Sequence, residues 1–215
     1  MTGIFTRCFM AVKEMKILYE VYDGLYINLT NRCPCACAFC IRKHTDHVGQ
    51  GNYSLWLEHE PDYDEIVNAF RKVNLNKYSE AVFCGFGEPT EALDMLLETA
   101  RFIKNGFPEL PLRINTNGLG NLINGRDITP LFRGLIDRIS ISLNTPDEVD
   151  YYNLVKPRFG VKSFNAMLDF AEKAKLYVPE VTMTTVETTI TKKQEEECRM
   201  ICGKIGVRYR IRPLE

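Results

Sequence analysis

Four of the eight cysteines in the chain fall within one short segment, at positions 33, 35, 37 and 40. Neighbours in this group are too close along the backbone to form unstrained disulfides with one another. Cys33, Cys37 and Cys40 have the spacing C-x3-C-x2-C. Three thiolates on one loop can hold three irons of a [4Fe–4S] cluster and leave the fourth iron without a protein ligand.

The composition indicates in which cellular compartment the protein lies and which classes of partner it does not bind. Lys and Arg number 27 and Asp and Glu number 28 in 215 residues, so no broad field attracts nucleic acid or an anionic membrane. No apolar run approaches the length of a membrane span, and Lys13 and Glu14 interrupt any signal-like core at the start. We therefore expect a cytoplasmic protein with reduced thiols, in which clustered cysteines are metal ligands or redox groups.

The chain contains 45% hydrophobic residues and no linker-like segment, which is typical of one domain. Residues 1–15 match no element, and we expect them to form a poorly ordered tail, with Met15 an equally good start site. The predicted domain covers residues 16–215. It alternates strand patterns with helical patterns, which predicts parallel strands joined by right-handed crossovers. The strands are expected at 25–30, 80–84, 111–116, 138–143, 180–187 and 207–212, and the helices at 62–75, 91–105, 128–135, 162–176 and 192–204.

Several of these strands carry polar side chains at alternate positions and apolar ones between them. The polar set includes Arg113 and Asn115, Ser140 and Ser142, and the three arginines at 208, 210 and 212. A parallel sheet covered on both faces is apolar on both. The pattern therefore favours an α/β fold with a partial (β/α)6 TIM-type barrel, whose polar inner face holds a ligand. A sandwich with one partly uncovered face is the alternative. Active groups in either fold lie at the carboxyl ends of the strands.

The sequence resembles the radical S-adenosylmethionine (radical SAM) superfamily. That family carries C-x3-C-x-aromatic-C, and Phe39 is the aromatic residue here. The segments CGFGEPT at 84–90, TNG at 116–118 and ISISLN at 139–144 match further loops and strands of the family, so that the likeness spans roughly residues 24–213. The segments YDGLYINLTNRCPCACAFC and GVRYRIRPLE are most similar to the TatD-associated radical SAM group.

The resemblance implies an enzyme with two cofactors, a [4Fe–4S] cluster and S-adenosylmethionine. Reductive cleavage of S-adenosylmethionine would give a 5′-deoxyadenosyl radical that abstracts hydrogen from an unknown substrate, a small molecule or a protein, with an electron donor such as flavodoxin or ferredoxin. The cluster ligands would be Cys33, Cys37 and Cys40. Gly87 and Glu88 would hold the methionine amino group, Ser142 and Asn144 the ribose, and Phe39 would lie near the adenine. The full set of cofactor-binding candidates is Phe39, Gly85, Gly87, Glu88, Asn117, Ser142 and Asn144.

Other functions remain open from the sequence. The cysteines with His44 and His47 could form a structural zinc site, although their spacing is too cramped for the usual finger. A non-catalytic iron–sulfur protein needs no glycine-rich loop, and a glycyl-radical activating enzyme acting on a protein partner would be comparably compact. Cys35 lies outside the signature and is interpreted as a buried thiol. Cys198 and Cys202 share one helix face and are interpreted as core residues.

The arginines of the last predicted strand form a further candidate site. Arg208, Arg210 and Arg212 recur with period two, so their side chains point the same way. Some of the three are expected to pair internally, for instance with Glu187 at the end of the preceding strand, and the alternative for Arg208 is contact with solvent at the lower rim. We predict that Arg210 and Arg212 bind a carboxylate or phosphate of the cofactor or substrate.

Overall fold

The structure is a computed structural model that describes residues 15–45 and 53–213. The predicted tail at 1–15 therefore lies outside the described residues, Met15 excepted. The strands are β1 (Leu18–Val21), β2 (Gly24–Ile27), β3 (Glu80–Phe83), β4 (Leu112–Thr116), β5 (Arg138–Ser142), β6 (Glu180–Val186) and β7 (Arg208–Arg212). The helices are α1 (Tyr63–Arg71), α2 (Leu93–Gly106), α3 (Gly120–Asn124), α4 (Glu148–Val155), α5 (Ser163–Ala174) and α6 (Lys192–Ile205). Short 3-10 turns are η1 (Ile41–Lys43), η2 (Leu75–Lys77), η3 (Pro89–Ala92) and η4 (Thr129–Phe132).

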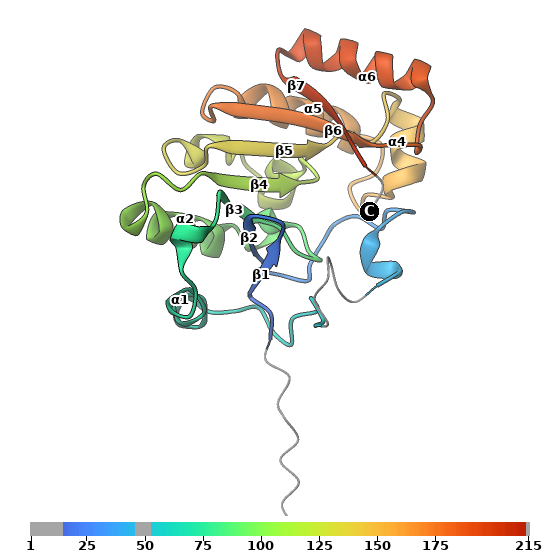
Figure 1. Ribbon diagram of the computed structural model, residues 1–215. Coiled ribbons are helices and arrows are strands. Elements are labelled where there is room, and N and C mark those ends of the chain that lie inside the picture. The colour runs from blue at the N-terminus through green and yellow to red at the C-terminus, as the bar shows by residue number, and fades with distance from the viewer. Residues whose placement is uncertain (1–14, 46–52, 214–215) are drawn as a thin grey trace, which may run out of the picture.

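All seven strands form one sheet in the order of the sequence (Figure 1). β2 to β7 pair in parallel, as predicted, and β1 adds an antiparallel strand to the edge of β2. The α/β partial barrel predicted from the sequence is confirmed. No helix in the described part of the chain is long and apolar enough to cross a bilayer.

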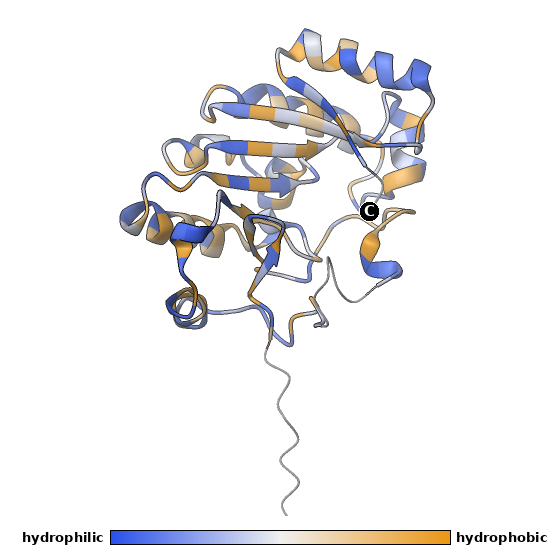
Figure 2. Ribbon diagram, in the orientation of Figure 1, coloured by the Kyte–Doolittle hydropathy of each residue, from blue (hydrophilic) through white to orange (hydrophobic). Residues whose placement is uncertain are grey.

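The two faces of the sheet differ as the alternation of residues predicts. Figure 2 shows hydrophilic and hydrophobic bands alternating along β4, β5 and β6. Ile114, Ile139 and Ile141 are buried in the main core, where they pack with helix residues such as Met167 and Phe170 of α5. The helices therefore cover the apolar face, and the polar residues line the other face.

The helix predicted between β4 and β5 at 128–135 is wrong. The structure has only the 3-10 turn η4 there, and the helix in this connection is α3. Gly134, within the predicted range, has a φ of +71°, which ends regular right-handed structure.

Two further elements were not predicted at all. β1 is joined to β2 by a tight turn at Tyr22, whose φ is +53°. α4 begins after Asp147, whose carboxylate accepts hydrogen bonds from the backbone N–H groups of Val149 and Asp150. An N-cap aspartate followed by acidic residues is a helix-start signal, and it could have located α4.

Candidate active site

The cysteine segment follows β2 at its carboxyl end and docks on the end of α4. Ala36 and Ala38 donate backbone hydrogen bonds to the carbonyls of Val155 and Leu154 over 3.0 and 2.9 Å. These carbonyls are among those that the last turn of a helix leaves without partners. The loop of residues 33–40, called the cysteine loop below, is thereby held beside the α4–α5 connection.

Three thiols of this loop interact with one another. Cys35 is buried, and its thiol hydrogen-bonds to Cys33 and Cys37. These bonds lower the pKa of Cys33 and Cys37, and the positive charge of Arg42 adds to the effect. A lowered pKa favours the thiolate, which is the form that binds metals.

Cys40 stands apart from these thiols and is linked to the group through its backbone. Its N–H donates to the carbonyl of Cys37 over 3.4 Å, at the start of η1. Among residues 15–45 and 53–213, no three His, Cys, Asp or Glu side chains are arranged to hold a metal ion. His47, of the alternative zinc site, lies outside the described residues.

The glycine-rich loop after β3 packs directly against the chain that leads into the cysteine loop. A Cβ on Gly85 would lie 2.0 Å from Oδ1 of Asn28, and one on Gly87 would lie 2.1 Å from the carbonyl oxygen of Thr30. Only glycine allows two backbone segments to approach so closely. Phe86, between them, is buried with Tyr19 and Leu55 and does not disturb this contact.

Glu88 is buried and links three loops. Its Oε1 accepts hydrogen bonds from the hydroxyl of Thr90 at 2.8 Å and of Thr116 at 2.7 Å, and its Oε2 accepts one from the backbone N–H of Asn117 at 2.7 Å. Burial raises the pKa of this carboxyl, and the hydrogen bonds oppose that effect. Because Oε1 also accepts from the N–H of Thr90, it is saturated, whereas Oε2 has room for another donor.

Asn117, directly after β4, contacts both of these loops. Its amide nitrogen lies 4.0 Å from Sγ of Cys33 and 3.7 Å from Sγ of Cys35, while its backbone binds Glu88. The residues Cys33, Glu88 and Asn117, which the sequence separates by up to 84 positions, therefore meet at one point.

Asn144 closes the site at the carboxyl end of β5. It is 3% exposed and adopts a left-handed conformation with φ of +67°, and its Oδ1 has no hydrogen-bond partner among the described residues. Buried polar atoms nearly always have a partner, and strained conformations gather at functional sites. Ser142, two residues earlier, is half-buried, as is Phe39 in the cysteine loop.

The side chains of β7 follow the predicted register. Tyr209 lies on the helix side, where its hydroxyl is 2.7 Å from that of Thr185 and the guanidinium of Arg199 in α6 stacks on its ring. The three arginines of β7 therefore lie on the polar face. Arg212 is half-buried there. Burial raises the pKa of the Cys84 thiol directly after β3, and the positive charge of Arg212 is one of the effects that lower it.

A row of alternating charges crosses the amino-terminal edge of the polar face. Glu80 pairs with Arg113 at 2.6 Å and with Arg138 at 3.4 Å, and Glu180 pairs with Arg138 at 3.8 Å and with Arg208 at 3.2 Å. Arg208 thus pairs with Glu180 at the lower rim, where its side chain is also exposed to solvent. The two carboxylates of this charge row pair with all three of its arginines, and Arg210 and Arg212 lie above the row, nearer the carboxyl ends of the strands.

Arg42 is a residue that the sequence reasoning missed. Its guanidinium donates to the backbone carbonyls of Asn31, Phe86 and Cys35 at 3.4, 3.3 and 3.1 Å. It therefore binds the cysteine loop to the glycine-rich loop. A cation two residues after the last signature cysteine is the only sequence signal for it.

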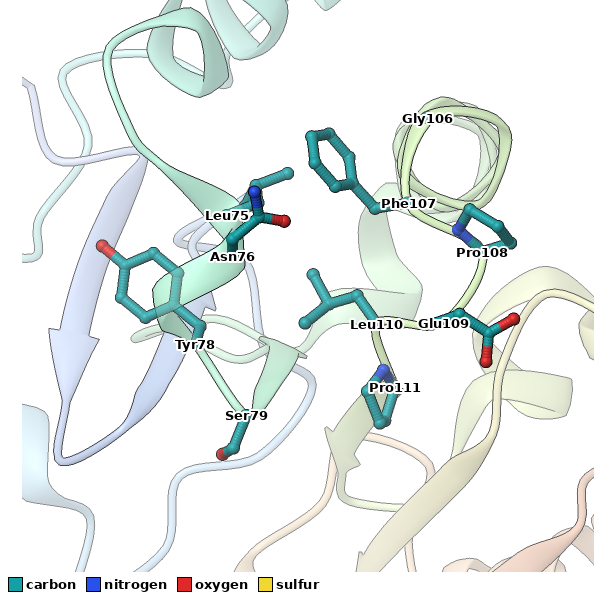
Figure 3. Close-up of a pocket in the computed structure, with 10 residues that line it drawn as sticks. All are labelled: Leu75, Asn76, Tyr78, Ser79, Gly106, Phe107, Pro108, Glu109, Leu110 and Pro111. Atoms are coloured by element: carbon teal, nitrogen blue, oxygen red, sulfur yellow. The ribbon is translucent and has the colours of Figure 1, made fainter.

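One cavity lies away from this site. It has a volume of about 430 Å³ and is lined by residues that precede β3 and β4, among them Tyr78, Phe107 and Leu110 (Figure 3). This places it at the amino ends of the strands, opposite the cysteine loop. A second cavity, of about 360 Å³, is lined by residues of α5 and α6 on the outer surface.

Comparisons with known proteins agree with this geometry. The model of the radical SAM superfamily matches residues 27–205. No curated protein sequence matched the chain. Among solved structures, Streptococcus suis SuiB bound to its precursor peptide SuiA is 17% identical with a TM-score of 0.63, over 90% of this chain and 39% of SuiB. The same protein bound to S-adenosylmethionine gives a TM-score of 0.56 and 18% identity, over 88% of this chain and 38% of that one.

A radical SAM methyltransferase from Sphaerobacter thermophilus is also similar in structure. It is 15% identical with a TM-score of 0.57, over 91% of this chain and 68% of its own. The chain thus spans about two fifths of SuiB and two thirds of the methyltransferase. At these identities the structures show a shared fold, and the family match extends over most of the chain. The chain therefore belongs to the radical SAM superfamily, whose members use a [4Fe–4S] cluster and S-adenosylmethionine.

Proposed function

We propose that the chain is a radical SAM enzyme that cleaves S-adenosylmethionine reductively and abstracts hydrogen from an organic substrate. The observation that carries the proposal is the contact of Asn117 with Cys33 and Glu88, which brings the cysteine loop, the glycine-rich loop and the end of β4 together. An electron carrier or a zinc site needs only the first of these three.

The donor set suits both cofactors. Cys33, Cys37 and Cys40 would hold three irons, and Arg42 would offset the negative charge of the thiolates. When bound, the reduced cluster supplies the electron that splits the sulfonium of S-adenosylmethionine into methionine and a 5′-deoxyadenosyl radical. The protein's own residues bind and orient the two reactants.

The residues around Glu88 would receive S-adenosylmethionine. The free acceptor capacity of Glu88 Oε2 suits the methionine amino group, beside Gly85, Gly87 and Asn117. The unpartnered Oδ1 of Asn144 suits a ribose hydroxyl, with Ser142 next to it. Phe39 would provide an apolar surface for the adenine.

The polar face beyond the cofactors would hold the substrate. Arg210 is exposed and Arg212 is half-buried on this face, above the charge row. Guanidinium groups bind carboxylates and phosphates through paired hydrogen bonds, so an anionic group on the substrate or cofactor is expected here. The motifs favour the TatD-associated group within the superfamily, a cytoplasmic enzyme of one domain over residues 16–215, and a flavodoxin or ferredoxin as electron donor.

Anaerobic reconstitution with iron and sulfide, followed by reduction with dithionite in the presence of S-adenosylmethionine, tests the proposal. We expect about four irons per chain and release of 5′-deoxyadenosine and methionine, measured by liquid chromatography. The variant with Cys33, Cys37 and Cys40 all replaced by Ala is the matched control and should release neither. A wild-type chain that binds iron but yields no 5′-deoxyadenosine would support an electron carrier instead.

A further inference from the structure

The site contains one buried tyrosine that the cofactor assignments do not use. Tyr151 lies in α4, is 1% exposed, and its hydroxyl has no hydrogen-bond partner among the described residues. A buried hydroxyl without a partner is rare, and each case requires an explanation. Tyr152, the next residue, is 41% exposed. The chain thus places one tyrosine inside and one outside at adjacent positions.

The backbone contacts of α4 place Tyr151 under the cysteine loop. It lies one helical turn before Val155, so the two residues share a face. Val155 is buried, and its carbonyl accepts the hydrogen bond from Ala36. The chain beyond the helix continues this contact, since Cys35 and Pro157 form a β-bridge and the N–H of Arg158 donates to the carbonyl of Pro34 over 2.8 Å.

The ring and the hydroxyl of Tyr151 have different surroundings. The ring packs against Phe164 of α5, with centroids 5.5 Å apart. Burial raises the pKa of the hydroxyl, and the negative charges of Cys35, Cys37 and Glu88 raise it further. The hydroxyl is therefore a buried hydrogen-bond donor that has no acceptor among the described residues.

We propose that the Tyr151 hydroxyl donates a hydrogen bond to a sulfur atom of the bound cluster or of its cysteine ligands. Hydrogen bonds to these sulfurs stabilise the more negative, reduced state and so raise the reduction potential. This inference rests on the cluster site proposed above. It assigns to α4 a part in setting how readily the cluster accepts an electron.

The test compares wild-type, Tyr151→Phe and Tyr152→Phe proteins after reconstitution. Midpoint potentials are measured by redox titration monitored by electron paramagnetic resonance. Tyr151→Phe should keep its iron but be harder to reduce by about tenfold in the equilibrium constant, a shift of about 59 mV to more negative potential for one electron. Tyr152→Phe should match the wild type. Equal potentials for wild type and Tyr151→Phe overturn this inference alone, and a wild-type chain that binds no cluster overturns the cluster site with it.

A second measurement separates the hydrogen bond from simple packing. Without iron, Tyr151→Phe removes a hydroxyl that lacks a partner, so the melting temperature should stay the same or rise. With the cluster bound, the same variant should melt below the wild type. A fall of equal size in both forms would mean that Tyr151 only fills space, and it would contradict the proposal.

Discussion

The backbone N–H of Glu88 donates to the carbonyl oxygen of Arg32 over 2.8 Å, and this bond joins the glycine-rich loop to the residue directly before Cys33. Gly87 makes the bond possible, because a Cβ there would lie 2.1 Å from the carbonyl oxygen of Thr30 and 2.7 Å from that of Arg32. The two cofactor loops therefore cannot move independently.

We expect Gly87→Ala to lower the free energy of unfolding by about 2 to 3 kcal/mol, since the added methyl group overlaps backbone atoms. It should also reduce iron uptake. Denaturation in urea and iron analysis measure the two effects. Gly203→Ala is the control, because a Cβ there meets nothing within 4 Å, and alanine in α6 should stabilise by about 0.5 to 1 kcal/mol. Equal stability of the two variants would show that the loops are not packed as described.

Replacement of Cys33, Cys37 or Cys40 by Ala should abolish the cluster, because each would remove one of three iron ligands. Cys35→Ala should retain about four irons per chain, although Cys35 contacts Cys33 and Cys37. Iron and sulfide analysis with visible absorption spectra measures the result. If Cys35→Ala lost its iron and Cys40→Ala kept it, the third iron ligand would be Cys35 and not Cys40.

Glu88→Gln should retain iron but weaken binding of S-adenosylmethionine, since a charge-assisted hydrogen bond becomes a neutral one, a loss of about 1 to 2 kcal/mol. The amide would also place donor hydrogens against the N–H and hydroxyl donors that now surround Glu88, so stability should fall as well. Equilibrium binding and urea denaturation separate the two effects. Glu98→Gln, on the exposed side of α2, should change neither. Unchanged affinity in Glu88→Gln would remove this carboxylate from the cofactor site.

Glu80→Gln should destabilise the fold by about 2 kcal/mol, because it leaves Arg113 and Arg138 without their shared carboxylate in a partly buried site. The side chains of Glu80 and Arg113 are 19% and 15% exposed, so solvent screens the loss only in part. The control is Glu196→Gln, which breaks a pair with Arg199 in which both side chains are more than half exposed, and it should cost less than about 1 kcal/mol. Equal costs would mean that the charge row contributes no more than a surface pair.

The thiols of Cys198 and Cys202 give the stability a dependence on high pH. Burial raises their pKa to about 12 and about 11. The thiol of an unfolded cysteine has a lower pKa. Between that value and the pKa in the folded chain, the folded chain binds more protons than the unfolded chain, so the free energy of unfolding falls as the pH rises through this interval. Urea denaturation from pH 8 to pH 11 should show the decline. Cys198→Ala should reduce its slope, and an unchanged slope would mean that other groups cause it.

The sequence predicted which strand residues face the site, because side chains alternate between the two faces of a strand. Arg113 and Asn115 of β4 lie on the polar face with the arginines of β7 because successive residues of any strand face opposite ways. It also predicted the loops that carry glycines and cysteines, since their spacing is local. These predictions do not depend on which segments of the chain are in contact in the folded structure.

The role of Tyr151 could not be predicted in this way. Its place under the cysteine loop arises because α4 docks on Ala36 and Ala38, more than a hundred residues earlier in the chain, and only the packed fold reveals that contact. The same holds for Arg42, whose three carbonyl partners come from two loops. The helix expected at 128–135 failed for a local reason, because Gly134 adopts a left-handed conformation within the predicted range.

Among the described residues, β1 and β7 are the two edge strands of the sheet, and each has a feature that disfavours aggregation. β1 at one margin has only four residues, and β7 at the other carries three arginines in five positions. Pairing of two copies through β7 would bring these like charges together, which disfavours growth of a continuous intermolecular sheet. Neutral substitutions at Arg210 and Arg212 would therefore remove a barrier to self-association as well as the proposed anion site.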